Sequence, residues 1–113
     1  MDIENVKIQM RKGILEYCIL SIISKHKEVY ASDILQMLKE GKLIVVEGTL
    51  YPLLTRLRKS ELLNYRWEES LSGPPRKYYN LTEKGEKFVE ELNMTWEDLL
   101  YAVNITTKKH LQS

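Results

Sequence analysis

Cysteine is almost absent from this sequence: Cys18 is the only one among 113 residues. An intramolecular disulfide is therefore excluded, and a reducing compartment such as the cytoplasm is favoured. Cys18 falls on the apolar side of a helical pattern, so we expect it to be a small core residue.

Motifs that carry chemistry are also missing. His26 and His110 stand far apart without other ligands nearby, and no group of Cys and His has the spacing of a zinc site. The chain has no glycine-rich phosphate loop and no nucleophile with an evident base. We therefore expect no metal, no cofactor and no enzymatic activity.

Long hydrophobic runs are lacking as well. The most apolar early stretch, residues 14–23, contains Glu16, Tyr17 and Ser21. A membrane-spanning helix needs about 20 apolar residues, and a signal peptide needs a small-residue cleavage region that this stretch does not have. The sequence predicts a cytoplasmic protein with no membrane partner.

Charge is nearly balanced but unevenly distributed. The formal net charge of +1 neither favours nor excludes a nucleic-acid partner. Arg56, Arg58 and Lys59 stand together without an acid, whereas six acids gather between residues 83 and 98. This segregation can build a basic face, although the three cations can also simply complement the negative end of a helix dipole.

What the sequence has in abundance is helical periodicity. Apolar residues recur every three or four positions through 14–23, 30–39 and 50–57, which predicts three helices, the first beginning well upstream. Gly41 suits the left-handed position after the second helix. The short β-branched run 43–46 is expected to be extended.

The third helix has a polar face opposite its leucines. At about 100° per residue this side carries Gly48, Pro52, Thr55, Arg56 and Lys59, with Tyr51 on its flank. Pro52 fits the first turn if Thr49 is the N-cap; otherwise the helix begins earlier and bends at Pro52.

The period then changes to two, which predicts a β-hairpin. Residues 64–69 and 76–81 alternate, and Gly73-Pro74-Pro75 is expected to form the turn. This arrangement puts Arg76 and Lys77 near the tip, where they either touch a negatively charged partner or are merely solvated. The alternation predicts that Tyr79 is buried and that Tyr78 faces outward.

A long helix follows, with Thr82 as its expected N-cap. Its apolar residues form a heptad pattern toward His110: Val89, Leu92, Trp96, Leu99 and Val103. A helix of about 28 residues is about 42 Å long, which is more than a small domain can cover. We therefore expect a homodimer that uses these five residues.

The order of elements predicts a mainly α (α+β) fold, a winged helix-turn-helix with a two-stranded β wing and a long C-terminal dimerisation helix. Residues 1–81 would form the DNA-binding domain, with the first helix also contributing to the dimer, and residues 82–113 the dimerisation helix. In such a fold the third helix enters the major groove of DNA and the wing lies beside the duplex.

Two runs in the sequence resemble the PadR family of transcriptional regulators. They are EGTLYPLLTRL at 47–57 and PRKYYNLTEKG at 75–85, and the single C-terminal helix is similar to the smaller subfamily. The resemblance implies a dimeric, ligand-responsive repressor that binds double-stranded DNA at a pseudo-palindromic operator. Carried over to this chain, the implied DNA-binding positions are Gly48, Thr49, Tyr51, Pro52, Thr55, Arg56, Arg76 and Lys77; Lys59 joins them from the basic face.

The resemblance leaves three points open. Glu61 stands where the family usually has Gly, at a position suited to left-handed backbone. Met10, Trp96 and Leu99 are either plain packing or the floor of a pocket for an aromatic or cationic effector, a reading that rests partly on the family's use of the dimer interface. The alternative function is a winged-helix protein-interaction module that has lost DNA binding.

Overall fold

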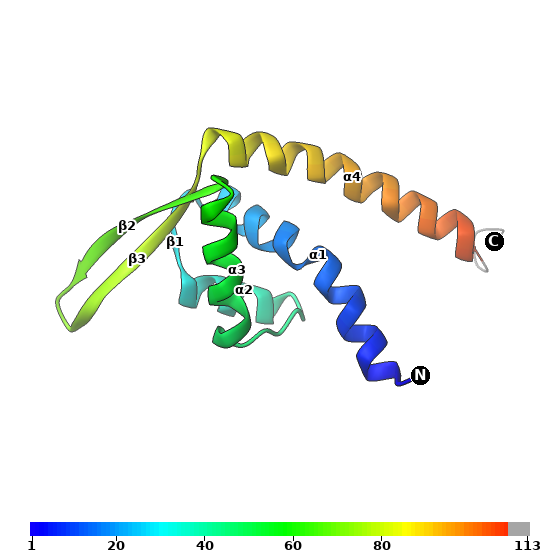
Figure 1. The fold of residues 1–113 in the computed structure, drawn as a ribbon, viewed down its shortest axis with the longest axis horizontal. Helices are drawn as coiled ribbons and strands as arrows, with labels where there is room; N and C mark the ends of the chain where they lie inside the picture. The colour runs from blue at the N-terminus through cyan, green and yellow to red at the C-terminus, as the bar shows by residue number, and fades with distance from the viewer. Residues whose placement is uncertain (109–113) are drawn as a thin grey trace.

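A computed structural model describes residues 1–108. Figure 1 shows a central head, made of α2, α3 and the C-terminal half of α1. The β2–β3 wing projects from it to one side, while α4 and the N-terminal half of α1 extend to the other. The described part of the chain is therefore elongated, at 57 × 32 × 25 Å. The elements in order are α1 Ile3–His26, β1 Val29–Tyr30, α2 Ala31–Glu40, α3 Glu47–Lys59, β2 Leu63–Ser70, β3 Gly73–Leu81 and α4 Glu83–Thr107.

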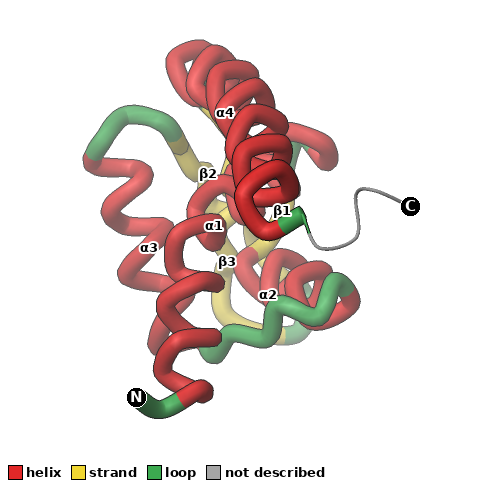
Figure 2. The backbone as a smooth tube through the Cα atoms, turned by 90° about the vertical axis from the view of Figure 1, so that its right-hand side faces the viewer, coloured by secondary structure: helices red, strands yellow, loops and turns green. Residues whose placement is uncertain are grey.

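This architecture is the predicted winged helix-turn-helix with a long C-terminal helix. The predicted continuation of the last helix to His110 falls outside the described residues. Figure 2, seen end-on, shows α4 passing over the head rather than joining its helical layer.

The core lies where the apolar stripes of α1, α2 and α3 meet the base of the wing. Ile19, Leu50 and Leu54 are fully buried there. Cys18 is half-buried and packs against this core, as expected, and burial raises the pKa of its thiol. Tyr79 is buried, as the alternation predicts, and burial likewise raises the pKa of its phenol.

The sheet has three strands in the order β1-β3-β2, one more than predicted. The extra strand, β1, pairs antiparallel with β3 through Val29↔Tyr79 and Tyr30↔Tyr78. Two residues are too few to show alternation in the sequence. Residues 43–46, by contrast, form a loop and not a strand, although Val46 is extended at φ −98° and ψ 162°.

The hairpin tip is Leu71 and Ser72, so the prediction that Gly73-Pro74-Pro75 forms the turn is wrong. The two prolines lie inside β3, which is possible because β1 pairs only with the other end of this strand and proline is tolerated at an unpaired edge. Arg76 therefore pairs with Glu68 and Lys77 with Trp67, within the wing and not at its tip.

The end of α3 is a Schellman motif, in which the residue after the C-cap is left-handed. Leu62 N–H donates to the Leu57 carbonyl at 3.1 Å and Glu61 N–H donates to the Arg58 carbonyl at 2.9 Å. Glu61 has φ 65°, the conformation that the usual glycine would suit. The end of α2 differs from the prediction: Gly41 has φ −84°, and Lys42 is the left-handed residue at φ 68°.

We predict that Glu61→Gly stabilises the protein. Relieving a left-handed non-glycine residue is expected to raise the free energy of unfolding by about 1 kcal/mol. Chemical denaturation measures this change, with Ser60→Gly as the control, because Ser60 has φ −81° and gains nothing from glycine. A Glu61→Gly protein no more stable than wild type would show that the left-handed residue carries no strain.

The first turn of α4 is fastened to this same end of α3. Thr82 caps α4 as predicted, with its hydroxyl oxygen accepting from Gly85 N–H at 2.9 Å. The Thr82 hydroxyl also donates to the Glu61 carbonyl at 2.7 Å, and Thr82 N–H donates to the Leu62 carbonyl at 3.1 Å. These hydrogen bonds fasten the start of the long helix to the end of α3.

Candidate nucleic-acid interface

The exposed face of α3 brings most of the predicted recognition residues together. A shallow hollow of about 530 Å³ is lined by Tyr51, Pro52, Thr55, Arg56 and Lys59. Gly48 and Thr49 are exposed in the first turn of the same helix. The face is continuous, and it is open enough to be reached by a partner as large as a duplex.

Helix α3 begins earlier than a Thr49 cap would allow. Its N-cap is Val46, so Thr49 is inside the helix and Pro52 is well past the orphan N–H groups. The earlier start agrees with the second of the two predicted alternatives. Because proline has no N–H, the Gly48 carbonyl lacks its helical donor. A Cβ at Gly48 would meet nothing within 4 Å, so the backbone is accessible there.

The wing holds its two cations against aromatic rings. Arg76 lies over the Tyr30 ring, with its Cζ 5.0 Å from the ring centroid. Lys77 lies over Tyr65 and Trp67, with its Nζ 4.4 Å and 5.3 Å from the two centroids. Cation–π contacts of this kind restrict where each charged group can go.

The corner between α3 and the wing is a second hollow, of about 260 Å³. It brings Tyr51 of α3 together with Arg76 and Lys77 of β3, and its floor includes Tyr30 and the buried Tyr79. The helix and the wing therefore present one surface, as predicted from residues far apart in the sequence.

Arg56 has a partner that sequence reasoning missed. Its Nη2 lies 2.9 Å from Glu16 Oε2 and its Nε donates to the same oxygen at 3.3 Å, although the Arg56 side chain stays 63% exposed and that of Glu16 39%. Arg58, from the same basic cluster, instead lies over the Tyr65 ring at 5.7 Å. A group on an external partner would therefore compete with this carboxylate of α1 for Arg56.

The predicted dimer residues divide into two groups. Val89 is buried in the core of its own chain, and Leu92 packs partly against that core, so neither is free for a partner. Leu99 and Val103 are about half exposed, at 49% and 48%. In the single chain, the more exposed part of the pattern begins at Trp96, and the dimer interface stays a prediction.

The proposed effector residues do line one groove. Met10 of α1 and Trp96 and Leu99 of α4 border an almost wholly apolar hollow of about 340 Å³, which also includes Ile14 and Val103. The groove runs between α1 and α4 where both have left the head, and Leu99 and Val103 remain about half exposed beside it. A partner or a ligand can occupy this space.

Within residues 1–108, no helix is long and apolar enough to cross a membrane. Over the same part of the chain, no cluster of three or more His, Cys, Asp or Glu side chains is arranged to hold a metal ion.

The chain is similar to several known proteins. Residues 19–91 match the profile of the Transcriptional regulator PadR-like family. A PadR-like transcription factor from Bacteroides fragilis is 62% identical, and the match covers 90% of this chain and 98% of that one with a TM-score of 0.76. For a PadR-like transcriptional regulator from Bacillus cereus the identity is 41%, the coverage 90% and 99%, and the TM-score 0.78.

One similar structure contains a nucleic acid. PadR of Bacillus subtilis, solved in complex with operator DNA, is 26% identical, covers 70% of this chain and 46% of that one, and has a TM-score of 0.64.

Proposed function

Because the chain belongs to the PadR-like family of transcriptional regulators, we propose that it is a repressor which binds a pseudo-palindromic operator as a homodimer and releases it when a ligand binds. It is a regulator and not an enzyme. One observation above all supports operator binding: Tyr51, Arg76 and Lys77 surround one hollow where α3 meets the wing. The relative solved with operator DNA supports the same partner.

We assign base recognition to α3, which lies in the major groove in this proposal. Thr49, Tyr51, Thr55 and Arg56 are the side chains available to base edges, and an arginine bidentate to guanine is the commonest specific contact. Gly48 and Pro52 allow close approach of the helix. Arg56 leaves Glu16 to reach its base, so the ion pair on α1 competes with DNA.

Phosphate contacts fall to Lys59, Arg76 and Lys77. Such contacts fix the register of a protein on the duplex and give most of the salt-dependent affinity. Since the net charge of the chain is only +1, its attraction to DNA depends on this local arrangement. A cytoplasmic location follows from such a role.

The homodimer in this proposal joins two chains through Trp96, Leu99 and Val103 together with α1. A two-fold axis at this surface would put two α3 helices in successive major grooves, about 34 Å apart. An aromatic or cationic effector in the groove beside Met10 and Trp96 would change the angle between the two chains. It would lower operator affinity by favouring one dimer geometry over the other.

The test is a binding titration with a charge-matched control. Duplexes selected from a random-sequence pool by the wild-type protein are titrated by fluorescence anisotropy at two salt concentrations. We expect Arg56→Ala/Lys77→Ala to weaken binding about 30-fold and to reduce the salt dependence, since one base contact and one phosphate contact are removed. Lys39→Ala/Lys87→Ala removes the same charge from exposed positions outside the surface and should bind like wild type.

Two results would contradict the proposal. If selection enriches no sequence and wild-type binding is weak, the surface does not read DNA, and a protein partner becomes the better assignment. If both double variants lose affinity equally, binding depends on total charge and not on the α3–wing surface.

A further inference from the structure

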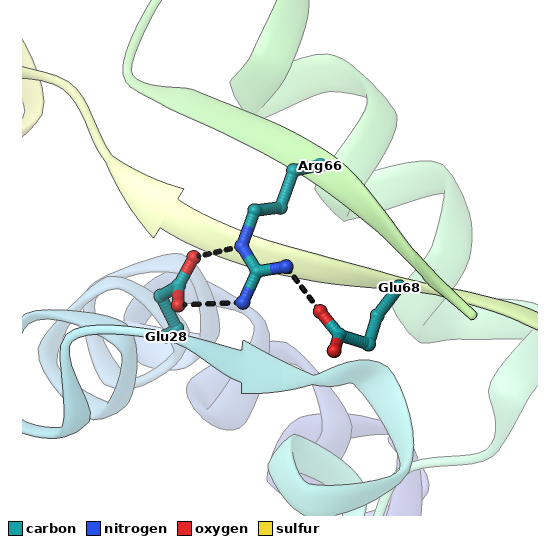
Figure 3. Close-up of polar contacts among 3 residues, drawn as sticks. All are labelled: Glu28, Arg66 and Glu68. Atoms are coloured by element: carbon teal, nitrogen blue, oxygen red, sulfur yellow. Dashed lines mark hydrogen bonds and ion pairs between the residues drawn. The ribbon is translucent and has the colours of Figure 1, made fainter. Parts of the chain in front are cut away.

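A bidentate ion pair joins the wing to the segment between α1 and β1. Arg66 of β2 donates from Nε to Glu28 Oε2 at 2.7 Å and from Nη2 to Glu28 Oε1 at 3.0 Å. Its third nitrogen, Nη1, donates to Glu68 on the same strand, as Figure 3 shows. The hydrogen bond from Arg66 lowers the pKa of the Glu28 carboxyl, so the pair is ionised at neutral pH.

The same arginine begins a stack of planar groups across the sheet. The Arg66 Cζ lies 4.8 Å from the Tyr78 ring centroid. Tyr78 stacks on Tyr30 with centroids 4.0 Å apart and planes at 15°. Arg76 lies over Tyr30 in turn. A continuous series of contacts therefore runs from Glu28 to a wing cation that the proposed function assigns to DNA.

The backbone alone attaches the wing weakly. Strand β1 has only two residues, so few hydrogen bonds hold the hairpin to the head. An isolated two-stranded hairpin is marginally stable in water. Side chains must therefore set its angle, and the stack that begins at Glu28 crosses the junction between wing and head.

We propose that Glu28 and Arg66 are positioning residues for DNA binding, which fix the wing at the angle that lets Arg76 and Lys77 meet the same duplex as α3. The inference rests on the proposed function, because it explains how that surface is held together. Neither residue lines the hollows on α3 or at the α3–wing corner. Their effect on DNA is exerted through Tyr78, Tyr30 and Arg76.

The sign of the effect distinguishes positioning from simple electrostatics. Removing an acid from a DNA-binding protein normally strengthens its attraction to phosphates. Positioning requires the reverse, because a neutral Gln at position 28 leaves Arg66 paired only with Glu68 on its own strand, so the ion pair between wing and head is lost. A direct phosphate contact by Arg66 would leave Arg66→Lys near wild type, whereas positioning weakens it, since lysine cannot form the two-pronged pair.

The experiment compares wild type, Glu28→Gln, Arg66→Lys and the control Glu69→Gln on the selected duplex and on a random duplex. Glu69 is an exposed acid of β2 with no ion pair within residues 1–108. We expect Glu28→Gln and Arg66→Lys to weaken binding to the selected duplex about fivefold, the scale of a well-oriented exposed pair. The affinity of these two variants for the random duplex should stay unchanged or rise slightly. The Glu69→Gln control should bind both duplexes at least as tightly as wild type.

A measurement without DNA separates this inference from the proposed function. Amide hydrogen exchange should be faster at Val29, Tyr30 and Tyr79 in Glu28→Gln than in wild type, while the helices keep their protection. If wild type selects no duplex, the proposed function fails. The exchange result then still tests whether the Glu28–Arg66 pair holds the wing to the head. If wild type binds and Glu28→Gln binds equally well or better, the positioning role is wrong.

Discussion

Gly85→Ala is expected to lower the free energy of unfolding by about 3 kcal/mol, the largest stability effect of any single methyl group that the fold predicts. A Cβ at position 85 would lie 2.2 Å from the Leu62 carbonyl oxygen and 3.1 Å from its carbon. Both neighbours are backbone atoms, which cannot rotate away as a side chain can. The glycine is needed because two backbones touch there, and not for an unusual φ angle.

The displaced helix would lose its attachment as well. Moving the first turn of α4 away from Leu62 breaks the hydrogen bond from Thr82 N–H and loosens the bond from the Thr82 hydroxyl to Glu61. The direction of α4 relative to the head would change. In the proposed dimer the same change alters the separation of the two α3 helices, so operator affinity should fall together with stability.

Gly48→Ala is the matched control for this prediction. A Cβ at Gly48 meets nothing within 4 Å, and alanine favours a helix by up to about 1 kcal/mol over glycine. Urea denaturation should therefore show Gly48→Ala as stable as wild type or slightly more stable. A Gly85→Ala protein of wild-type stability would mean that α4 is not packed against Leu62 in solution.

Local patterns predicted most of the fold. The leucine spacing of α3, the alternation of the wing and the Thr82 cap each depend on residues close in sequence, and each is where the pattern placed it. The left-handed conformation of Glu61 was also predictable, because a resemblance pointed to glycine there. The contact of these residues with DNA stays a prediction.

Long-range contacts left no signal in the sequence. The Arg56–Glu16 and Arg66–Glu28 pairs join residues 40 and 38 positions apart, and neither spacing has a periodicity that marks it. Strand β1 exists only because β3 lies beside it. The hairpin tip was misplaced because Gly-Pro usually indicates a turn, whereas here β1 leaves that edge of β3 free for proline.

Leu99→Glu is expected to convert the proposed dimer into monomers and to weaken operator binding at least about 100-fold. Leu99 is half exposed beside Trp96 and Val103 in the apolar groove between α1 and α4. Burying a glutamate there would desolvate a charge without a partner. Two linked heads bind two half-sites with an effective concentration in the millimolar range, and a monomer loses that gain.

Ile44→Glu is the matched control, since Ile44 is also an exposed apolar side chain, at 70%, but lies in the loop before α3. Analytical ultracentrifugation should find Leu99→Glu monomeric and Ile44→Glu dimeric.

A duplex with a single half-site separates association from recognition. A Leu99→Glu monomer and one head of the wild-type protein should bind it equally, because α3 and the wing are untouched. A Leu99→Glu protein that remains dimeric would place the interface elsewhere on α1 or α4. A Leu99→Glu monomer that also binds the half-site more weakly than wild type would show that α4 supports the DNA-binding surface of α3 and the wing. Dimerisation and DNA recognition would then not be separable.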